Sequence, residues 1–368
     1  MLQPILFYLP VGSGHLRAAI ALQQAFQMYG YKPILYNALS NQPRYLERFL
    51  DRVNRLSQDK LRKVYNILWW SDFQYSILEK IGINVLKDDI VQFLRQYRSK
   101  RCIIIATHAL PCLVLSRIRG YVPWIRGVYC TITDFGLHYF WPLDQIDGYF
   151  VHHEDIAKTL VYRGVSSRKV FISGIPIDVS FEQYAPYRPY FQRLRLLFVV
   201  GGIKGMYYKM RTIIKILNQW KRMISPSSLA TITIVTGNDR IARSLQALVP
   251  FSPSRVVVLG KVTTMHTYMA RHNILLTKPG GLILSEALAI GQAVLLTRSG
   301  SGQERANEEF LARYGAARLC ETPARCAQIL QTFYTYPEQL KRLQRSAKAL
   351  GKPYAARKAV RFILDNTR

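Results

Sequence analysis

Two titratable side chains in the first half of the chain could move a proton. His15 stands in GSGHLRAA, after a glycine loop and at a predicted helix start, where the helix dipole disfavours imidazolium and keeps the ring available as a base. Asp134 directly follows an apolar run in TITDFGLHYFW. Taken alone, His15 has a plain explanation as a loop residue and Asp134 as a turn cap. Because both follow predicted strands of one domain, they indicate an acid–base pair.

The second half of the chain carries two glycine pairs. Gly201 and Gly202 follow the run LLFVV, and Gly280 and Gly281 open a predicted helix in LLTKPGGLILSEALA. Backbone amides freed by such turns can bind phosphate oxygens without a metal. Glu286, one turn into that helix, could accept hydrogen bonds from ribose hydroxyls, with a stabilising first-turn charge as the alternative.

A further polar group opens the helix predicted from GSGQERAN. Gln303, Glu304 and Asn307 can converge on a polyhydroxylated ligand above the helix start. The order of glycine turn, acidic residue, second glycine turn and Gln-Glu-x-x-Asn indicates a site for a nucleotide diphosphate carrying a polar group. The sequence has neither a D-x-D between its halves nor a His/Cys cluster with metal spacing, so metal-free catalysis is predicted.

Short apolar, β-rich runs alternate with helical patterns along the chain and must position these residues. Continuous rather than alternating hydrophobicity indicates buried parallel strands, and the interleaved helices indicate βαβ units. We therefore predict an α/β fold with two doubly wound parallel-sheet domains, as a length of 368 residues also favours. The irregular segment 180–192, rich in Pro, Tyr and Arg, predicts the linker. The predicted domains cover residues 1–185 and 193–350, and residues 351–368 form a final helix.

Charge is the unusual feature of the composition. The chain has 51 Lys and Arg residues against 22 Asp and Glu, a net charge of +29. An anionic membrane, phosphorylated substrates and nucleic acid all fit this charge. The sequence shows no RRM, KH or zinc pattern, and nucleic-acid binding would not explain Glu286 and Gln303-Glu304, so we predict no nucleic-acid partner. The 5 cysteines include no C-x-x-C pair, which indicates neither a disulfide framework nor a zinc site and fits a reducing cytosol.

Residues 44–56 predict a basic amphipathic helix. Arg48, Arg52 and Arg55 fall opposite its apolar face, and Trp69 and Trp70 follow further along the chain. A core-facing helix with a solvated arginine face is the plain explanation. The cationic composition favours a second hypothesis, a membrane-docking surface. No apolar run is long enough to span a membrane, and the N-terminus is typical of a strand rather than of a signal peptide, so the predicted membrane contact is peripheral.

In their order along the chain, these motifs resemble those of the GT-B glycosyltransferases of family 28. The likeness is to the branch with the monogalactosyldiacylglycerol synthases and the processive diacylglycerol glucosyltransferases. It rests on GSGHLRAA, TDFGLHYFW, GIPID, VVGGIKG, IVTGND, LTKPGGLILSEALA and GQERAN. The resemblance implies two Rossmann-like domains facing a cleft, with the lipid acceptor held by the first domain and the nucleotide-sugar by the second. It also implies a C-terminal helix that packs back on the first domain.

The resemblance implies an enzyme that transfers a hexose from a UDP-sugar to membrane diacylglycerol with inversion, at the cytoplasmic face of a membrane. Galactose and glucose both stay open, as do processivity and oligomeric state. Transfer of N-acetylglucosamine from its UDP donor to another lipid-linked acceptor is the alternative. No cofactor or metal is implied besides the donor substrate.

By motif position, the resemblance assigns roles to individual residues. Either His15 or Asp134 takes the proton from the acceptor hydroxyl. On the donor side, Gly280 and Gly281 contact the diphosphate and Glu286 contacts the ribose. Gln303 and Glu304 hold the sugar hydroxyls. With their neighbours, the predicted donor residues are Gly201, Gly202, Lys278, Gly280, Gly281, Ser285, Glu286, Gln303, Glu304 and Asn307. The acceptor and membrane side comprises Gly12, Gly14, His138, Trp141, Arg48, Arg52, Arg55, Trp69 and Trp70.

Overall fold

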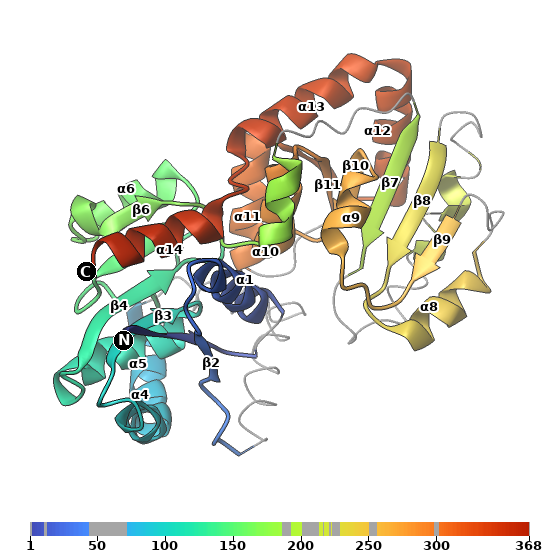
Figure 1. Cartoon of the computed structure of the whole chain (residues 1–368). Coiled ribbons are helices and arrows are strands. Elements are labelled where there is room, and N and C mark those ends of the chain that lie inside the picture. The colour runs from blue at the N-terminus through green and yellow to red at the C-terminus, as the bar shows by residue number, and fades with distance from the viewer. Residues whose placement is uncertain are drawn as a thin grey trace.

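Two six-stranded sheets, each with all its strands parallel, form the two halves of the chain in the computed structural model (Figure 1). The structure describes residues 2–10, 13–43, 72–185, 193–200, 213–215, 217–220, 222, 229–249, 256–297 and 302–367. Helices cover both faces of each sheet, so the predicted α/β class with two doubly wound domains is confirmed. All eleven apolar runs that were predicted as strands coincide with strands of these sheets.

The N-terminal sheet has the strand order β2-β1-β3-β4-β5-β6. Its strands are β1 (Leu2–Tyr8), β2 (Ile34–Asn37), β3 (Arg101–Ala106), β4 (Ile125–Thr131), β5 (Gly148–Val151) and β6 (Val170–Ile172). Its helices are α1 (Gly14–Met28), α4 (Asp72–Arg95), α5 (Ala109–Ile118) and α6 (Glu154–Tyr162), with the short 3₁₀ helices η1 (Arg119–Tyr121) and η2 (Ser167–Lys169). A longer 3₁₀ helix, η3 (Val179–Tyr184), lies at the junction of α1 and the C-terminal domain. The order reverses direction between β1 and β3, so these two strand ends form the topological switch point where such sheets bind ligands.

Strand β3 shows why the apolar runs are continuous. Ile104 packs in the cluster of α4 and α5 on one face, while Ile103 and Ile105 pack with α1 on the other face. All three side chains are fully buried. Alternate side chains point to opposite faces of a strand, so a strand covered on both faces must be apolar at every position.

The C-terminal sheet has the strand order β12-β11-β10-β7-β8-β9. Its strands are β7 (Leu194–Val199), β8 (Leu229–Val235), β9 (Val256–Leu259), β10 (Ile274–Thr277), β11 (Ala293–Thr297) and β12 (Ala317–Cys320). The helices described in this half are α8 (Asp239–Gln246), α9 (Met265–Ala270), α10 (Gly281–Ile290), α11 (Gly302–Arg313), α12 (Pro323–Thr335) and α13 (Pro337–Leu350). Renumbered in chain order, this is the Rossmann arrangement, with its switch point between β7 and β10. Helix α10 begins directly after β10, at that point.

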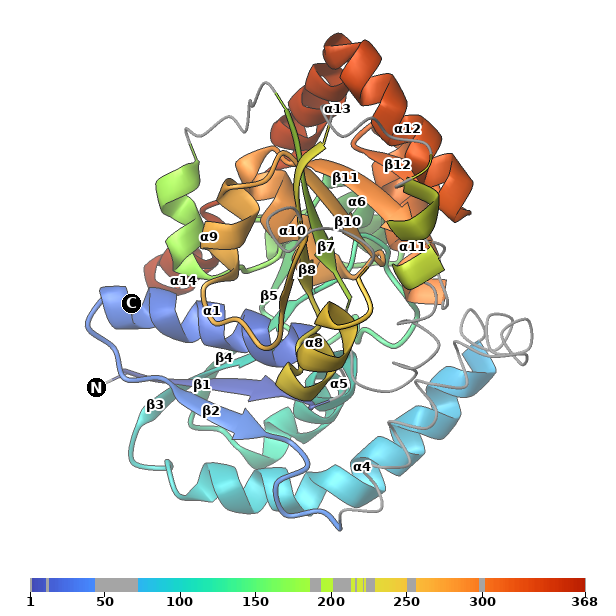
Figure 2. The same cartoon turned by 90° about the vertical axis from the view of Figure 1, so that its right-hand side faces the viewer.

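The two domains share apolar contacts. Ala18 of α1 and Phe135 of the loop after β4 belong to the same buried cluster as Leu284 and Leu288 of α10. Figure 2 shows α1 between the N-terminal sheet and the strands of the C-terminal sheet. The last helix, α14 (Ala355–Asp365), leaves the C-terminal domain and lies on the N-terminal sheet beside α1 (Figure 1). The start of α10 is thereby held close to the start of α1.

Some sequence predictions are corrected or lie outside the description. Strand β12 was not predicted, because the exposed Arg318 interrupts its short apolar pattern. The expectation that the cysteines form no disulfide is wrong for one pair, since α5 packs beside β4 and Cys112 and Cys130 are joined across that contact. The predicted residues outside the described part of the chain are Gly12, Arg48, Arg52, Arg55, Trp69, Trp70, Gly201 and Gly202. Within the described part, no helix is long and apolar enough to cross a membrane.

Candidate active site

His15 lies in the first turn of α1, where the ends of β1, β3 and β4 meet. Its Nδ1 is 2.7 Å from the carbonyl oxygen of Thr107, which follows β3, and 3.2 Å from Oγ1 of Thr133, which follows β4. A carbonyl oxygen can only accept a hydrogen bond, so Nδ1 carries the proton and donates it. The lone pair is therefore on Nε2, which is the tautomer that a general base requires.

Two other features keep the His15 ring neutral. Burial lowers its pKa, against the opposing effects of the Asp134 carboxyl and of the hydrogen bond to Thr107. The His108 ring lies edge-on to it, with 4.5 Å between ring centroids. His108 caps α5 by accepting a hydrogen bond from the Leu110 amide, and burial together with His15 lowers its pKa well below the usual value. Neutral imidazole is thus the form in which His15 meets a substrate at neutral pH.

Asp134 lies between the two domains. Its Oδ1 accepts a hydrogen bond of 3.0 Å from Nδ2 of Asn307 in α11. A β-carbon added to Gly281, the first residue of α10, would lie 3.0 Å from the same oxygen and 2.1 Å from the Thr133 carbonyl oxygen. Burial raises the pKa of Asp134, and the Asn307 hydrogen bond and the charge of His15 lower it. The carboxyl group thus sits against the positive end of a helix of the other domain.

The start of α10 offers backbone donors. Gly280 is the residue before the helix, with extended backbone angles, and no side chain of the described residues caps the helix or places a negative charge in its first turn. The first amides of a helix have no partner within the helix, so they are available to an anion. Ser285 does not add a further donor for an anion, because its hydroxyl donates to the Gly281 carbonyl oxygen at 2.9 Å.

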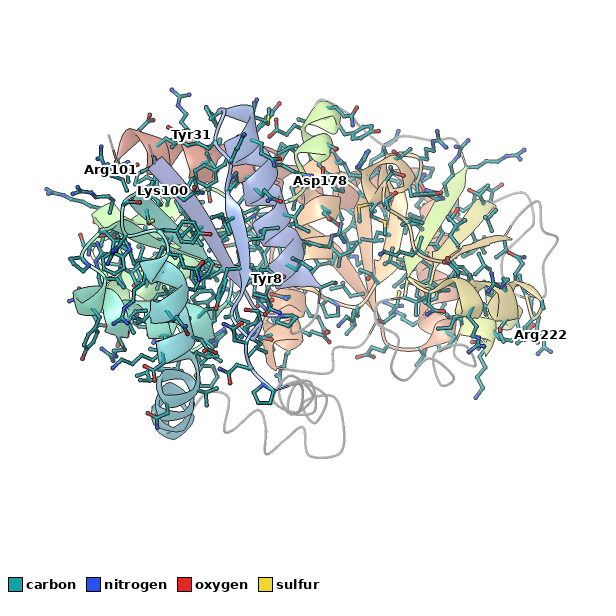
Figure 3. All side chains as sticks on the ribbon, turned by 60° about the horizontal axis from the view of Figure 1, so that its bottom comes forward. Tyr8, Tyr31, Lys100, Arg101, Asp178 and Arg222 are labelled. Carbon is teal, nitrogen blue, oxygen red and sulfur yellow. A yellow bond between two sulfur atoms is a disulfide. The ribbon has the colours of Figure 1, made fainter. Side chains whose placement is uncertain are left out.

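Glu286 is fully buried in α10 and pairs with Arg17 of α1. Arg17 Nη2 lies 2.5 Å from Glu286 Oε1, while Oε2 has no hydrogen-bond partner among the described residues. Burial raises the pKa of Glu286 to about 7, against the lowering effect of Arg17, and Asp178 adds to the rise. Figure 3 shows Asp178 at the junction of α1 and the C-terminal domain. A buried oxygen without a partner is costly, so Oε2 is suited to accept a hydrogen bond from a ligand hydroxyl.

The predicted sugar contacts start α11. Lys278, before α10, donates to Oε1 of Glu304 at 2.6 Å, and Gln303 is the neighbouring partly buried residue. Lys278 and Glu304 both act on the pKa of Asp134. Among the described residues, no group of three or more His, Cys, Asp or Glu side chains is placed to hold a metal ion.

The structure brings most of the predicted residues together at one place. Beside His15 and Asp134, α1 and α10 are in contact: a β-carbon added to Gly14 of α1 would lie 4.0 Å from the β-carbon of Leu282 in α10. His138 and Trp141 are buried after β4, with their rings stacked at 5.7 Å between centroids and 7% and 2% exposed, and His138 is close enough to His15 for that ring to lower its pKa. Burial lowers the pKa of His138 to about 3. Their predicted contact with an acceptor stays a prediction.

Four residues of the site were not predicted from sequence: Arg17, Thr107, His108 and Thr133. Arg17 stands within the predicted helix start in GSGHLRAA and has no separate motif signal. Thr107 and His108 follow β3 in IIIATHAL, and Thr133 precedes Asp134. Thr107, His108 and Thr133 share one signal, a polar residue within two positions of the end of a buried strand, which is the rule that identified Asp134 itself.

Two Rossmann-like domains whose switch points face each other have the architecture of the GT-B fold. Over 99% of its length the chain superposes on all of Acinetobacter baumannii MurG, with a TM-score of 0.63 and 16% identity. It superposes on 96% of the S. aureus MnaA chain, solved with UDP, with a TM-score of 0.61 and 12% identity over 99% of this chain. At these identities the likeness shows the fold.

The sequence comparisons agree with the resemblance predicted from the motifs. Residues 15–177 match the family model of monogalactosyldiacylglycerol (MGDG) synthase. The chain is also 24% identical to a processive diacylglycerol β-glucosyltransferase of Bacillus pumilus, over 97% of this chain and 93% of the relative. The chain is similar to this branch of the family 28 glycosyltransferases over nearly its whole length, and the predicted resemblance is confirmed.

The two glycines at the start of α10 provide a matched pair of variants. Gly281→Ala places a methyl group within 2.1 Å of the Thr133 carbonyl oxygen, whereas the methyl group of Gly280→Ala is no closer than 3.7 Å to Ile283. Gly281→Ala should therefore force the domains apart and destabilise the protein by about 1–3 kcal/mol. Gly280→Ala should change stability by less than about 0.5 kcal/mol. Urea unfolding of both variants measures this difference, and equal unfolding midpoints would contradict the described contact.

The raised pKa of Glu286 predicts a pH-dependent effect of Glu286→Gln. A carboxyl whose pKa is about 7 when folded, against 4.5 as its ordinary value, stabilises the fold fully below pH 4.5 and loses this stabilisation as the pH rises through 7. Glutamine does not ionise. The stability of the variant relative to the wild type should thus rise by up to about 3 kcal/mol between about pH 5 and about pH 8. Urea unfolding across this range measures it, and a difference that does not vary with pH would show that Glu286 ionises normally.

Proposed function

We propose that the protein transfers a hexose, galactose or glucose, from a UDP-sugar to membrane diacylglycerol with inversion at the sugar. The observation that carries this proposal is the meeting of His15 and Asp134 of the N-terminal domain with the starts of α10 and α11. A base and an anion site on opposite domains suit transfer from an activated phosphate ester to an alcohol. The names of the relatives support diacylglycerol as the acceptor.

The donor would bind on the C-terminal domain. The diphosphate would lie at the amides of Gly280 and Gly281, where the dipole of α10 favours negative charge. The ribose hydroxyls would use Glu286, either through the unpartnered Oε2 or by displacing Arg17 from Oε1. Gln303 and Glu304 would hold the sugar hydroxyls. Gly201 and Gly202 complete the predicted donor set from outside the described residues.

The chemical step would be a direct displacement. His15 Nε2 or the Asp134 carboxylate takes the proton of the acceptor hydroxyl, the hydroxyl oxygen bonds to the anomeric carbon, and UDP leaves with the electrons of the broken C–O bond. The amides of α10 would stabilise the departing diphosphate, and the proposed step uses no metal. If His15 is the base, Asp134 stabilises the imidazolium that forms. Transfer of N-acetylglucosamine to another lipid-linked acceptor would use the same residues and is the alternative.

A diacylglycerol acceptor requires contact with a membrane surface, and we propose peripheral docking at the cytoplasmic face. The net charge of +29 suits an anionic leaflet, where each Lys or Arg near the surface contributes about 1 kcal/mol. The predicted docking residues Arg48, Arg52, Arg55, Trp69 and Trp70 lie outside the described residues. Exposed basic residues also occur on the C-terminal domain, for example Lys341, Arg342 and Arg345 of α13.

A transfer assay tests the proposed reaction. The protein, diacylglycerol liposomes and a panel of UDP-sugars should give a glycosyl diacylglycerol whose anomeric configuration is opposite to that of the donor. His15→Ala and Asp134→Asn should each lower kcat, by about 100-fold or more for the residue that is the base. Lys358→Ala, an exposed change on α14, serves as the control. Full activity of both site variants would contradict the site, and N-acetylglucosamine transfer alone would establish the alternative.

Liposome sedimentation tests the docking surface. Binding should be stronger to anionic than to neutral vesicles, and salt should weaken it, because the attraction is screened. Replacing Arg48, Arg52 and Arg55 together by Gln should reduce binding more than the matched replacement of Lys341, Arg342 and Arg345, although both remove the same charge. Equal binding to neutral and anionic vesicles would refute electrostatic docking, and equal effects of the two triple variants would refute the predicted surface.

A further inference from the structure

We propose that Asn307, in the donor-side domain, is the positioning residue of the Asp134 carboxylate in the acceptor-side domain, rather than a contact of the donor sugar. The inference rests on the proposed function for the role of Asp134. It means that the acceptor-side carboxylate is aligned by a side chain of the opposite domain, and only while the two domains are in contact.

The hydrogen bonds of Asn307 carry the inference. The side chain is fully buried, and its Oδ1 accepts from the Phe135 amide at 2.7 Å. Its Nδ2 donates to Asp134 Oδ1 and to the carbonyl oxygen of Pro279, both at 3.0 Å. The Phe135 amide needs an acceptor and the Pro279 carbonyl needs a donor, which fixes the orientation of the Asn307 amide. Both amide hydrogens are used, so none is left for a sugar hydroxyl.

The loop that carries Asp134 is shaped to fit α11 on either side of this amide. A β-carbon added to Gly136 would lie 2.6 Å from Cβ of Ala306, so a side chain at position 136 would not fit. The Phe135 ring stacks on Phe310, one turn further along α11, with 5.0 Å between ring centroids. Consecutive loop residues therefore contact one face of α11, and the Asn307 amide lies in the middle of that contact.

Asn307 acts on the charge state of Asp134 as well as on its position. The titratable and charged groups facing Asp134 are His15 from α1, Lys278 from the turn before α10, and Glu304 from α11. Among these neighbours, Asn307 contributes a neutral donor that favours the carboxylate. Glu304, a predicted sugar contact, lies one turn before Asn307 on the same helix. Donor binding and carboxylate alignment are thus linked through one rigid element.

Kinetics of Asn307→Ala distinguish a positioning role from a sugar contact. Losing a hydrogen bond to a charged group should lower kcat by about 10- to 100-fold, with the KM for the UDP-sugar changed by less than about threefold. The acid limb of the kcat profile should move to higher pH, because the Asp134 carboxylate loses a donor. Gln303→Ala, a predicted sugar contact on the same helix, should instead raise KM without moving the acid limb. An Asn307→Ala variant that behaves like Gln303→Ala would overturn the proposal.

A second variant and a second readout test the proposal even if Asn307→Ala does not fold. Gly136→Ala disturbs the same contact from the loop side and should also lower kcat and move the acid limb to higher pH. Carbon-13 NMR of Asp-labelled protein follows the Asp134 carboxyl directly, with Asp134→Asn assigning the signal. Its titration should move to higher pH in either variant, and an unmoved titration would overturn the proposal. This readout needs no turnover, so a wild type that transfers no hexose would refute the proposed function while NMR still decides on Asn307.

Discussion

The contact between the loop after β4 and the starts of α10 and α11 is the constraint on which the rest of the structure depends. At this contact the Thr133 carbonyl and the Asp134 carboxyl approach Gly281 so closely that no side chain would fit there. It brings the switch points of two separate sheets to one place. Because parallel sheets bind ligands at such points, the ligand-binding edge of each sheet faces the other domain. The α14 helix maintains this arrangement by packing the end of the chain on the first domain.

The electrostatics of the site follow from this closeness. His15, His108, Asp134 and Glu286 all titrate away from their usual values, and in each case burial is the largest cause. Burial favours neutral groups, so the imidazoles stay unprotonated and the acids bind protons more tightly. The charges of Arg17 and Lys278 offset part of this effect, by lowering the pKa of Glu286 and of Asp134 respectively. Such a site has fixed dipoles and little solvent, which suits stabilisation of charge that develops during a reaction.

Much of the fold could be predicted from the sequence, because buried parallel strands require apolar residues at every position and glycine turns mark where helices begin. The same rule located His15, Asp134 and Gly281 near strand ends, and Glu286 in the helix that follows one of them. It could not predict which strand ends meet. Arg17 and Glu286 are 269 residues apart, and Asp134 and Asn307 are 173 apart, so only packing between domains creates these pairs. The sequence predicted Asn307 as a ligand contact, whereas the structure shows its amide engaged between the domains.

The most direct test of the central claim, that the start of α10 and Glu286 form a nucleotide-diphosphate site facing His15 and Asp134, is a crystal structure of the protein with UDP. We expect diphosphate oxygens within about 3 Å of the first backbone amides of α10 and ribose hydroxyls bonded to Glu286. A UDP molecule bound elsewhere, with the start of α10 still covered by Asp134 and Glu286 bonded only to Arg17, would contradict it.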